Sequence, residues 1–559
     1  MVRQLFRWFN REFNGLQEAA ILLGLASLAS QLLGLGRDRL LAARFGAGAE
    51  LDIYYAAFRV PDLLYVSLGS FISAGIIIPF VVRYLTAGDR VATQAFFSRL
   101  LSVFGLAMIL ASAVAYWLMP RLGPLVVPGF DAAATAAWVA LARVILWSPL
   151  LLGLSNLLGS FTQSLRKFFI FALSPLFYNL GIIGGILFFY PRFGLVGLAW
   201  GVALGAALHL AIQLPTLFHH DLRPRLTLAF DWRELRQLFA ISLPRTLALS
   251  ASQLVTMVLV AFASLLAAGS IAVFNFAFAL QSIPLAIIGV SYSVAAFPTL
   301  ARLFSAGERA DFVAYLSRAA GSILFWTLPL AALLVVLRAQ IVRVVLGAGR
   351  FSWTDTRLTA AALALFAVSV AAQCLSLLFI RGYYAGGQTK KPLLINLVSS
   401  AMTVGLALTV GYWLPGLPFG RQFWGALVRV DEVAGATVLA LPLVFSIGAI
   451  LNAVWFWFAF ERDFGSYPAT LLATGRQSLL GAFFAGLAAY LTLRVLALPL
   501  DTATLVGIFS QGFLAGLVGL AVNFGWLYWR GNHELNELWL ALRHRFWLAK
   551  PLSPEMPEL

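Results

Sequence analysis

The chain has 559 residues, of which 61% are hydrophobic and only 11% are charged, and its mean hydropathy is +0.89. Soluble globular domains carry about 25% charged residues, so this composition excludes an ordinary soluble enzyme. The formal net charge of +16 is scattered between apolar runs instead of forming one stripe, so membrane topology explains it better than nucleic-acid binding.

Apolar runs long enough to cross a bilayer follow one another along almost the whole chain. A spanning helix needs about 20 mostly apolar residues, and a backbone in lipid must satisfy its hydrogen bonds within helices or a closed barrel. These runs predict an all-α polytopic membrane protein with about fourteen transmembrane helices. The predicted spans lie near residues 17–36, 52–86, 95–119, 134–158, 168–190, 193–217, 237–265, 268–301, 312–337, 358–385, 392–414, 433–460, 477–498 and 503–529.

Loop charges predict the orientation of these spans. Lys and Arg concentrate in cytoplasmic loops, and an arrangement with both termini inside gives inner loops about twice the basic residues of outer loops. The main exceptions form two groups of arginines, one after the first span and one after the ninth. They are Arg37, Arg39 and Arg44, and Arg338, Arg343 and Arg350. Such exceptions indicate either a function or a misplaced span.

Segments outside the spans complete the predicted organisation. Residues 1–16 and 531–559 each combine a basic face with an apolar face at helical spacing, which predicts amphipathic segments at the cytoplasmic interface. Residues 218–236 form a cytoplasmic amphipathic linker. The expected location is therefore the cell inner membrane, crossed many times, with both termini cytoplasmic.

Two weak internal echoes indicate a repeat. Residues 48–61 (GAELDIYYAAFRVP) resemble residues 269–284 (GSIAVFNFAFALQSIP) at an offset of 221, and Gln163 to Lys167 resembles Gln388 to Pro392 at an offset of 225. They predict two six-helix lobes, 17–217 and 237–460, related as parallel repeats by a pseudo-two-fold axis. Residues 461–530 are then an additional pair of helices.

No catalytic or metal-binding signature appears in the sequence. There is no G-x-x-x-x-G-K-[ST] phosphate loop, only one cysteine, and no H-E-x-x-H spacing among the five histidines. We therefore expect no enzymatic activity, no cofactor and no metal site.

The most informative residues are charged side chains in or near apolar spans, where a charge costs at least about 2.5–3.5 kcal/mol. Ion pairing between helices, such as Arg37 with Asp52, and contact with a substrate are both open explanations. An arginine without an acidic neighbour would suit a phosphate group in a cavity. The candidate substrate-binding residues are Arg37, Asp38, Asp52, Arg59, Arg143, Arg245 and Gln253, with Asp62 beside them.

The same region resembles a known family. The residues Gly34 to Asp38 (GLGRD), Phe45 to Gly48 (FGAG) and Phe58 to Leu63 (FRVPDL) look like the first two helices of the MurJ (MviN) lipid II flippases. Collinear matches follow at Val127 to Phe130 (VPGF), Ser174 and Pro175 with Asn179, Ser252 and Gln253, Ala263 to Ser270 (ASLLAAGS), Phe297 and Pro298, Gly347 to Phe351 (GAGRF) and Tyr384 to Pro392 (YAGGQTKKP).

The resemblance implies a fourteen-helix member of the MOP exporter superfamily that moves an undecaprenyl-diphosphate-linked peptidoglycan precursor by alternating access. It also implies that residues 461–530 form a groove for the lipid tail, and that cell-wall synthesis enzymes are partners beside the membrane lipids. Arg37, Asp38 and Asp52 match the family pattern, but three family arginine positions are occupied here by Gln31, Tyr65 and Ala279. Arg59, Arg143 or Arg245 compensate, or the substrate differs.

Other functions therefore stay open at the level of sequence. The chain could carry another polyprenyl-linked glycan, or act as a MATE-like cation-coupled antiporter with Asp52 and Asp62 as ion sites. It could also be a transport-inactive scaffold derived from the family.

Overall fold

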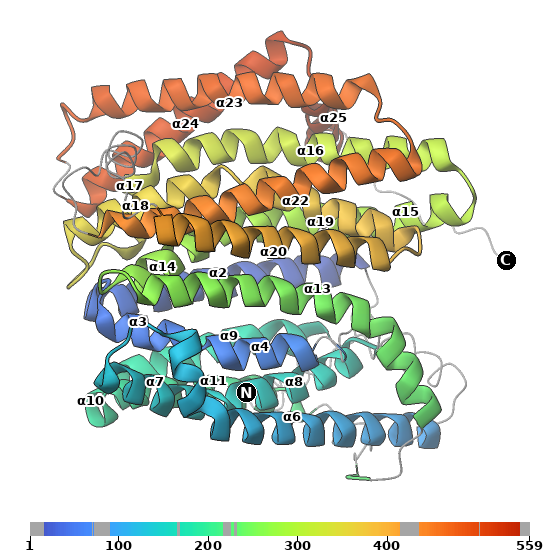
Figure 1. The fold of residues 1–559 in the computed structure, drawn as a ribbon. Coiled ribbons are helices and arrows are strands. Elements are labelled where there is room, and N and C mark those ends of the chain that lie inside the picture. Colours follow the sequence, from blue (N-terminus) through green and yellow to red (C-terminus); the bar gives the residue numbers. More distant parts are fainter. Residues whose placement is uncertain are drawn as a thin grey trace. The chain divides into compact units, whose positions relative to one another are not determined.

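A computed structural model describes residues 16–69, 71, 90–164, 168–215, 225–227, 232–413, 435–501 and 504–547. The predicted N-terminal amphipathic segment, most of the 218–236 linker, the second half of the predicted 52–86 span and the last residues of the tail lie outside these ranges. Within them the chain is helical and contains no strand, as the sequence predicts (Figure 1).

The helices of the described ranges follow in chain order. They are α2 (Leu16–Phe45), α3 (Ala49–Ala56), α4 (Arg59–Gly69), α6 (Arg90–Val126), α7 (Ala132–Ile145), α8 (Trp147–Ser164), α9 (Phe168–Gly184), the π-helix η2 (Gly185–Phe189), α10 (Tyr190–Phe193), α11 (Leu195–Ala211), α13 (Trp232–Ser264), α14 (Ser270–Pro284), the π-helix η3 (Leu285–Val290), α15 (Ser291–Ser305), α16 (Arg309–Val336), α17 (Arg338–Leu346), α18 (Trp353–Ala367), α19 (Val370–Ala385), α20 (Lys390–Trp413), the 3₁₀ turn η5 (Ala436–Leu439), α22 (Ala440–Phe464), α23 (Ala469–Leu496), α24 (Leu505–Trp529) and α25 (His533–Trp547).

Many of these helices are long and apolar enough to span a membrane. The described residues contain ten such helices, or eleven when α18 and α19, bent by 43° at their junction, count as one span. Three predicted spans are not among them: 17–36 falls on α2, 52–86 is only partly described, and 193–217 falls on α11, which has 17 residues. The polytopic helical fold is confirmed, and the total of fourteen stays a prediction.

The described chain forms two compact units. The first comprises residues 1–280, 345–362 and 389–448, and the second comprises residues 281–344, 363–388 and 449–559. The predicted lobes, 17–217 and 237–460, stay a prediction alongside this division.

Small residues bring the helices of the first unit close together. Along α9, η2 and α11 glycines face one another, so that a Cβ atom on Gly181 would lie 2.2 Å from Gly205 Cα and one on Gly185 would lie 2.5 Å from Gly201 Cα. Backbones in membrane proteins approach this closely only at small residues. A hydrophobic cluster fills the space between α6 and α8 in the same unit. It contains Phe96, Phe97, Leu100, Phe104, Met108, Leu157, Leu158 and Phe161.

In the second unit α23 packs against both α16 and α24. Every fourth residue of α24 is buried, which gives one narrow face: Gly507, Gln511, Ala515, Gly519, Asn523 and Leu527. Because only this face is buried, the rest of the surface of α24 is partly or fully exposed in the structure. The other sides of α23 and α24 expose large apolar residues, among them Phe483, Leu491, Phe513 and Val518.

Two helices of the described chain widen into π-helical turns, η2 and η3. The second follows Pro284 directly, where the proline nitrogen has no hydrogen to donate. Here Gly289 packs against the single cysteine of the chain, since a Cβ atom at Gly289 would lie 2.9 Å from Cys374 Sγ. The thiol is fully buried.

Candidate functional site

Helix α2 carries the first pair of candidate residues. Helix α2 contains Gly34 and Gly36 but continues without a break to Phe45. A single glycine in a helix costs only about 1 kcal/mol, which the packing of α2 against α9 can offset. Arg37 and Asp38 therefore project from a regular helix.

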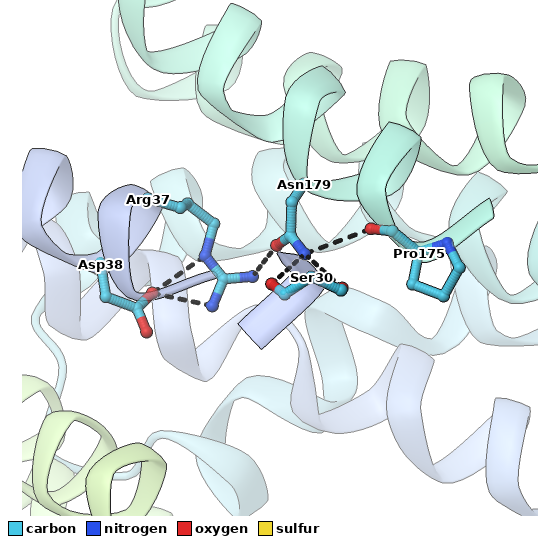
Figure 2. Close-up of polar contacts among 5 residues, drawn as sticks. All are labelled: Ser30, Arg37, Asp38, Pro175 and Asn179. Carbon is cyan, nitrogen blue, oxygen red and sulfur yellow. Dashed lines mark hydrogen bonds and ion pairs between the residues drawn. The ribbon is translucent and has the colours of Figure 1, made fainter. Parts of the chain in front are cut away.

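The guanidinium of Arg37 is held by two partners (Figure 2). Its Nε lies 2.9 Å and its Nη2 lies 2.8 Å from Asp38 Oδ1, and Nη1 donates to Asn179 Oδ1 on α9 at 3.0 Å. The amide of Asn179 is fixed in turn, since Nδ2 donates to Pro175 O at 3.2 Å and to Ser30 Oγ at 3.3 Å. A guanidinium has five N–H donors, so three contacts leave two for a ligand. Arg37 does not pair with Asp52, which was one of the two explanations left open by the sequence; it pairs with Asp38.

Asp52 binds backbone instead. It lies in the first turn of α3 with 5% of its surface exposed, and its carboxylate accepts hydrogen bonds from Gly269 N at 2.6 Å and Ala272 N at 2.8 Å. These amides begin α14, where the helix leaves its first N–H groups without partners inside the helix and the helix dipole favours a negative charge. Asp52 thus stabilises the start of a helix distant in sequence. The two segments that it joins are the echoing ones, 48–61 and 269–284.

Arg59 reaches the same helix α14. It begins α4, is buried, and donates from Nη2 to Asn275 Oδ1. Its Nε has no hydrogen-bond partner among the described residues. A buried donor without a partner costs free energy, which an oxygen acceptor at this position would recover. Asp62 follows one turn later on α4.

The other candidates lie apart from this group. Arg143, in the last turn of α7, donates from Nε to Tyr116 O at 3.2 Å and places its guanidinium carbon 4.3 Å from the Tyr116 ring centre. Arg245 and Gln253 both lie on α13 and are half-buried, and Arg245 has an interaction partner. The candidates that do lie together form two sets. Arg37 and Asp38 on α2 lie against α9, and Asp52 and Arg59 both bind α14.

The positions at which the resemblance implies a family arginine fall on the same helices. Gln31 is exposed on α2, Tyr65 lies on α4 with its hydroxyl against Asn156 Nδ2, and Ala279 lies on α14. Sequence reasoning missed Asn275, although an amide in the apolar run of α14 was a usable signal. Asn179 appeared there only as part of a motif, without its contact to Arg37.

Backbone contacts between loops close one end of this group. Gly269 has φ +92°, and a Cβ atom there would lie 2.0 Å from Ala47 O. Gly129 N donates to Ser264 Oγ at 3.1 Å, and a Cβ atom on Gly129 would lie 1.9 Å from Ser264 O. Only glycine permits contacts this close, and at Gly269 the left-handed backbone also favours it.

Comparison with known proteins decides the family. A family model described as lipid II flippase MurJ matches residues 41–509, which is most of the chain. The chain belongs to the lipid II flippase MurJ family. It is accordingly a multi-pass inner-membrane protein of a transporter family, and the resemblance inferred from the sequence is confirmed.

Individual MurJ relatives agree with this assignment. The chain is 27% identical over 488 residues to the protein named "Probable lipid II flippase MurJ" of Rhizobium tropici, which covers 82% of this chain and 90% of the relative. It is 30% identical over 423 residues to the protein of the same name from Bdellovibrio bacteriovorus, which covers 71% of this chain and 78% of the relative.

Solved structures confirm the fold. One titled "Lipid II flippase MurJ, inward closed conformation" matches with a TM-score of 0.69 at 21% identity, over 91% of this chain and 99% of the other. An inward-facing MATE family transporter of the MOP superfamily matches with a TM-score of 0.62 at 15% identity, over 82% and 99% of the two chains. MurJ and MATE proteins thus share this arrangement of helices.

Proposed function

We propose that this chain is a flippase that moves lipid II across the inner membrane by alternating access. The observation that carries the proposal is the match of the MurJ family model over residues 41–509. The sequence has no phosphate loop, so we expect no ATP hydrolysis by this chain, and a change in which side the binding site faces would carry the substrate across. The precursor's undecaprenyl tail would remain in lipid while its diphosphate and sugars cross inside the protein.

The diphosphate is the part of lipid II that arginines recognise, because a guanidinium offers paired donors to phosphate oxygens. We propose that Arg37 and Arg59 contact it, with Asp38 and Asp52 keeping neighbouring groups in place. Two free N–H bonds on Arg37 and the unused Nε of Arg59 support this assignment. Arg143, Arg245 and Gln253 stay candidate contacts of the sugar or the diphosphate.

The finer organisation belongs to the same proposal. Residues 461–530, which contain α23 and α24, would hold the lipid tail; the large apolar residues exposed on these two helices support this. Both termini would be cytoplasmic, and cell-wall synthesis enzymes would be partners. When the binding site opens toward the end where Gly129 and Gly269 pack, the backbone contacts of these glycines must separate.

Rescue of a bacterium depleted of its own lipid II flippase tests the function. We expect the wild-type chain to restore growth and normal cell shape. Membrane abundance is measured in parallel, and delivery of labelled precursor to the outer leaflet is followed directly. No rescue and no delivery at normal abundance would overturn the proposal and favour a transport-inactive scaffold. If the chain rescues only a strain that lacks the flippase for another polyprenyl-linked glycan, that glycan is the substrate instead of lipid II.

A further inference from the structure

Two groups of arginines that disagree with the positive-inside pattern meet in the folded chain. Arg39 and Arg44 follow the first predicted span, and Arg350 follows the ninth, about 300 positions later. In the first unit Arg39 Nη1 donates to Val345 O at 3.2 Å, and Arg350 N donates to Ala43 O at 2.8 Å. Three of the six exceptions, Arg39, Arg44 and Arg350, therefore lie at one junction in the first unit.

A cavity lies at this junction. It has a volume of about 350 Å³ and is lined by Ala43, Arg44, Tyr190 and Arg350. Small-molecule pockets in proteins measure roughly 300–1,000 Å³, so this one is large enough for a phosphate or a diphosphate group together with the atoms attached to it. Both lining arginines are exposed at its edge.

The side chains around the cavity are oriented but not neutralised. The guanidinium carbon of Arg44 lies 4.7 Å from the centre of the Tyr190 ring, and that ring meets Phe45 edge-on at 4.8 Å. Neither Arg44 nor Arg350 forms an ion pair with a carboxylate in the part of the chain that the structure describes. The neighbouring carboxylate of Asp355 instead accepts from backbone amides, Ser352 N at 2.8 Å and Ala47 N at 3.4 Å.

The backbone beneath the two arginines is fixed. Gly349 has φ +53°, and a Cβ atom there would lie 2.2 Å from Ala43 O; Gly46 has φ +65°, and its Cβ atom would lie 2.9 Å from Arg350 O. The loop at Gly46 and the loop at Gly349 therefore each need a glycine at the point where they pack on each other. The backbone from which Arg44 and Arg350 project therefore loses little freedom when a ligand binds.

We propose that Arg44, Arg350 and Tyr190 form a binding site for a phosphate or diphosphate group. Two guanidinium groups supply charge and paired donors, and the Tyr190 hydroxyl supplies a third. The site is separate from the contacts of Arg37 and Arg59 and does not depend on the proposed transport. Its anion comes from the head group of an anionic phospholipid or from a lipid-linked diphosphate, and both share this chemistry.

The test is binding of inorganic pyrophosphate to the purified full chain in phosphatidylcholine nanodiscs, followed by calorimetry. We expect saturable binding that the Arg44→Gln/Arg350→Gln variant weakens at least about tenfold, since it loses two charge-assisted contacts. Arg192→Gln is the matched control: it removes an exposed arginine close to Tyr190 that donates to Phe188 O and does not line the cavity. It should change the affinity by less than about twofold.

Nanodiscs of two further compositions identify the source of the anion. If phosphatidylglycerol competes with pyrophosphate in the wild type but not in the double variant, the anion is a phospholipid head group. If only undecaprenyl diphosphate competes, the anion is the lipid-linked diphosphate. No saturable pyrophosphate binding, or equal binding by wild type and double variant, overturns the site. Arg350→Gln alone carries the test if the double variant does not fold. Because binding and not transport is measured, failure here leaves the proposed flippase activity untouched.

Discussion

Asp52 offers the sharpest test of how the echoing segments are joined. Its carboxylate accepts from Gly269 N at 2.6 Å and from Ala272 N at 2.8 Å in a buried position. Asp52→Ala removes both acceptors and leaves the two amides unpaired. Asp52→Asn keeps one oxygen that can accept but removes the charge.

The structure gives the size of the effect. A hydrogen bond to a charged group contributes about 1.5–3 kcal/mol, so losing both costs about 3–6 kcal/mol in this conformation. Asp52→Asn should cost about half as much. Since 1.4 kcal/mol is a factor of ten, Asp52→Ala should reduce the population with α14 docked on α3 by at least about a hundredfold relative to the open form.

Hydrogen exchange at residues 264–272 measures this directly, with thermal unfolding and transport recorded on the same preparations. We expect faster exchange in the order wild type, Asp52→Asn, Asp52→Ala. Glu50→Gln is the control, because it removes an equal charge from the same first turn of α3. If the amides of Gly269 and Ala272 exchange in Asp52→Ala as they do in the wild type, the reasoning is refuted.

Three further predictions concern other parts of the chain. Gly269→Ala should destabilise the protein by clearly more than the roughly 1–2 kcal/mol that Gly307→Ala costs, because both have positive φ but only Gly269 packs on a carbonyl oxygen; thermal unfolding measures the difference. Arg37→Lys should impair rescue of flippase-depleted cells at normal membrane abundance, and Arg37→Ala should impair it more. Burial raises the pKa of Glu534, and the hydroxyl of Ser322 lowers it by donating a hydrogen bond. Docking of α25 should therefore become more stable as pH falls through that raised pKa, and amide hydrogen exchange in residues 533–540 should slow down. Glu534→Gln should remove this dependence on pH.

Each of these predictions has a result that contradicts it. Equal unfolding temperatures for the two glycine variants would show that the contact of Gly269 contributes nothing. Full rescue by Arg37→Ala would exclude Arg37 from transport, and rescue lost only with lost protein would make its role structural. If Glu537→Gln, which alters an exposed carboxylate of the same helix, removes the pH dependence as completely as Glu534→Gln, then burial of Glu534 is not its cause.

The sequence predicted the helical fold because hydrophobicity in a membrane protein is a property of each segment taken alone. Spans such as α16 and α24 appear in the structure where the apolar runs placed them, and the tail is helical at α25, whose amphipathic character stays a prediction. Residues 48–61 and 269–284, which echo each other, are joined by Asp52, and the pseudo-two-fold relation that their echo predicts stays a prediction. The family followed from motifs dense enough to align.

The partners of the charged residues could not be predicted this way. A buried charge must be compensated, but the sequence does not say whether a carboxylate, an amide or a backbone N–H does so. Arg37 uses its own neighbour Asp38 together with an amide on α9, Arg59 uses Asn275, and Arg143 uses a backbone oxygen and a ring. Those choices depend on how helices pack, and the packing depends on glycine contacts whose partners lie far away in the sequence.

The position of Cys374 has a practical consequence for spectroscopy. It is the only thiol in the chain, and it lies fully buried against the π-helical turn at Gly289. A buried thiol in apolar surroundings is inert toward water-soluble reagents. The native chain is therefore already a silent background for site-directed labelling, and a fluorophore or nitroxide on a cysteine introduced at an exposed position of α23 or α25 will report from that position alone.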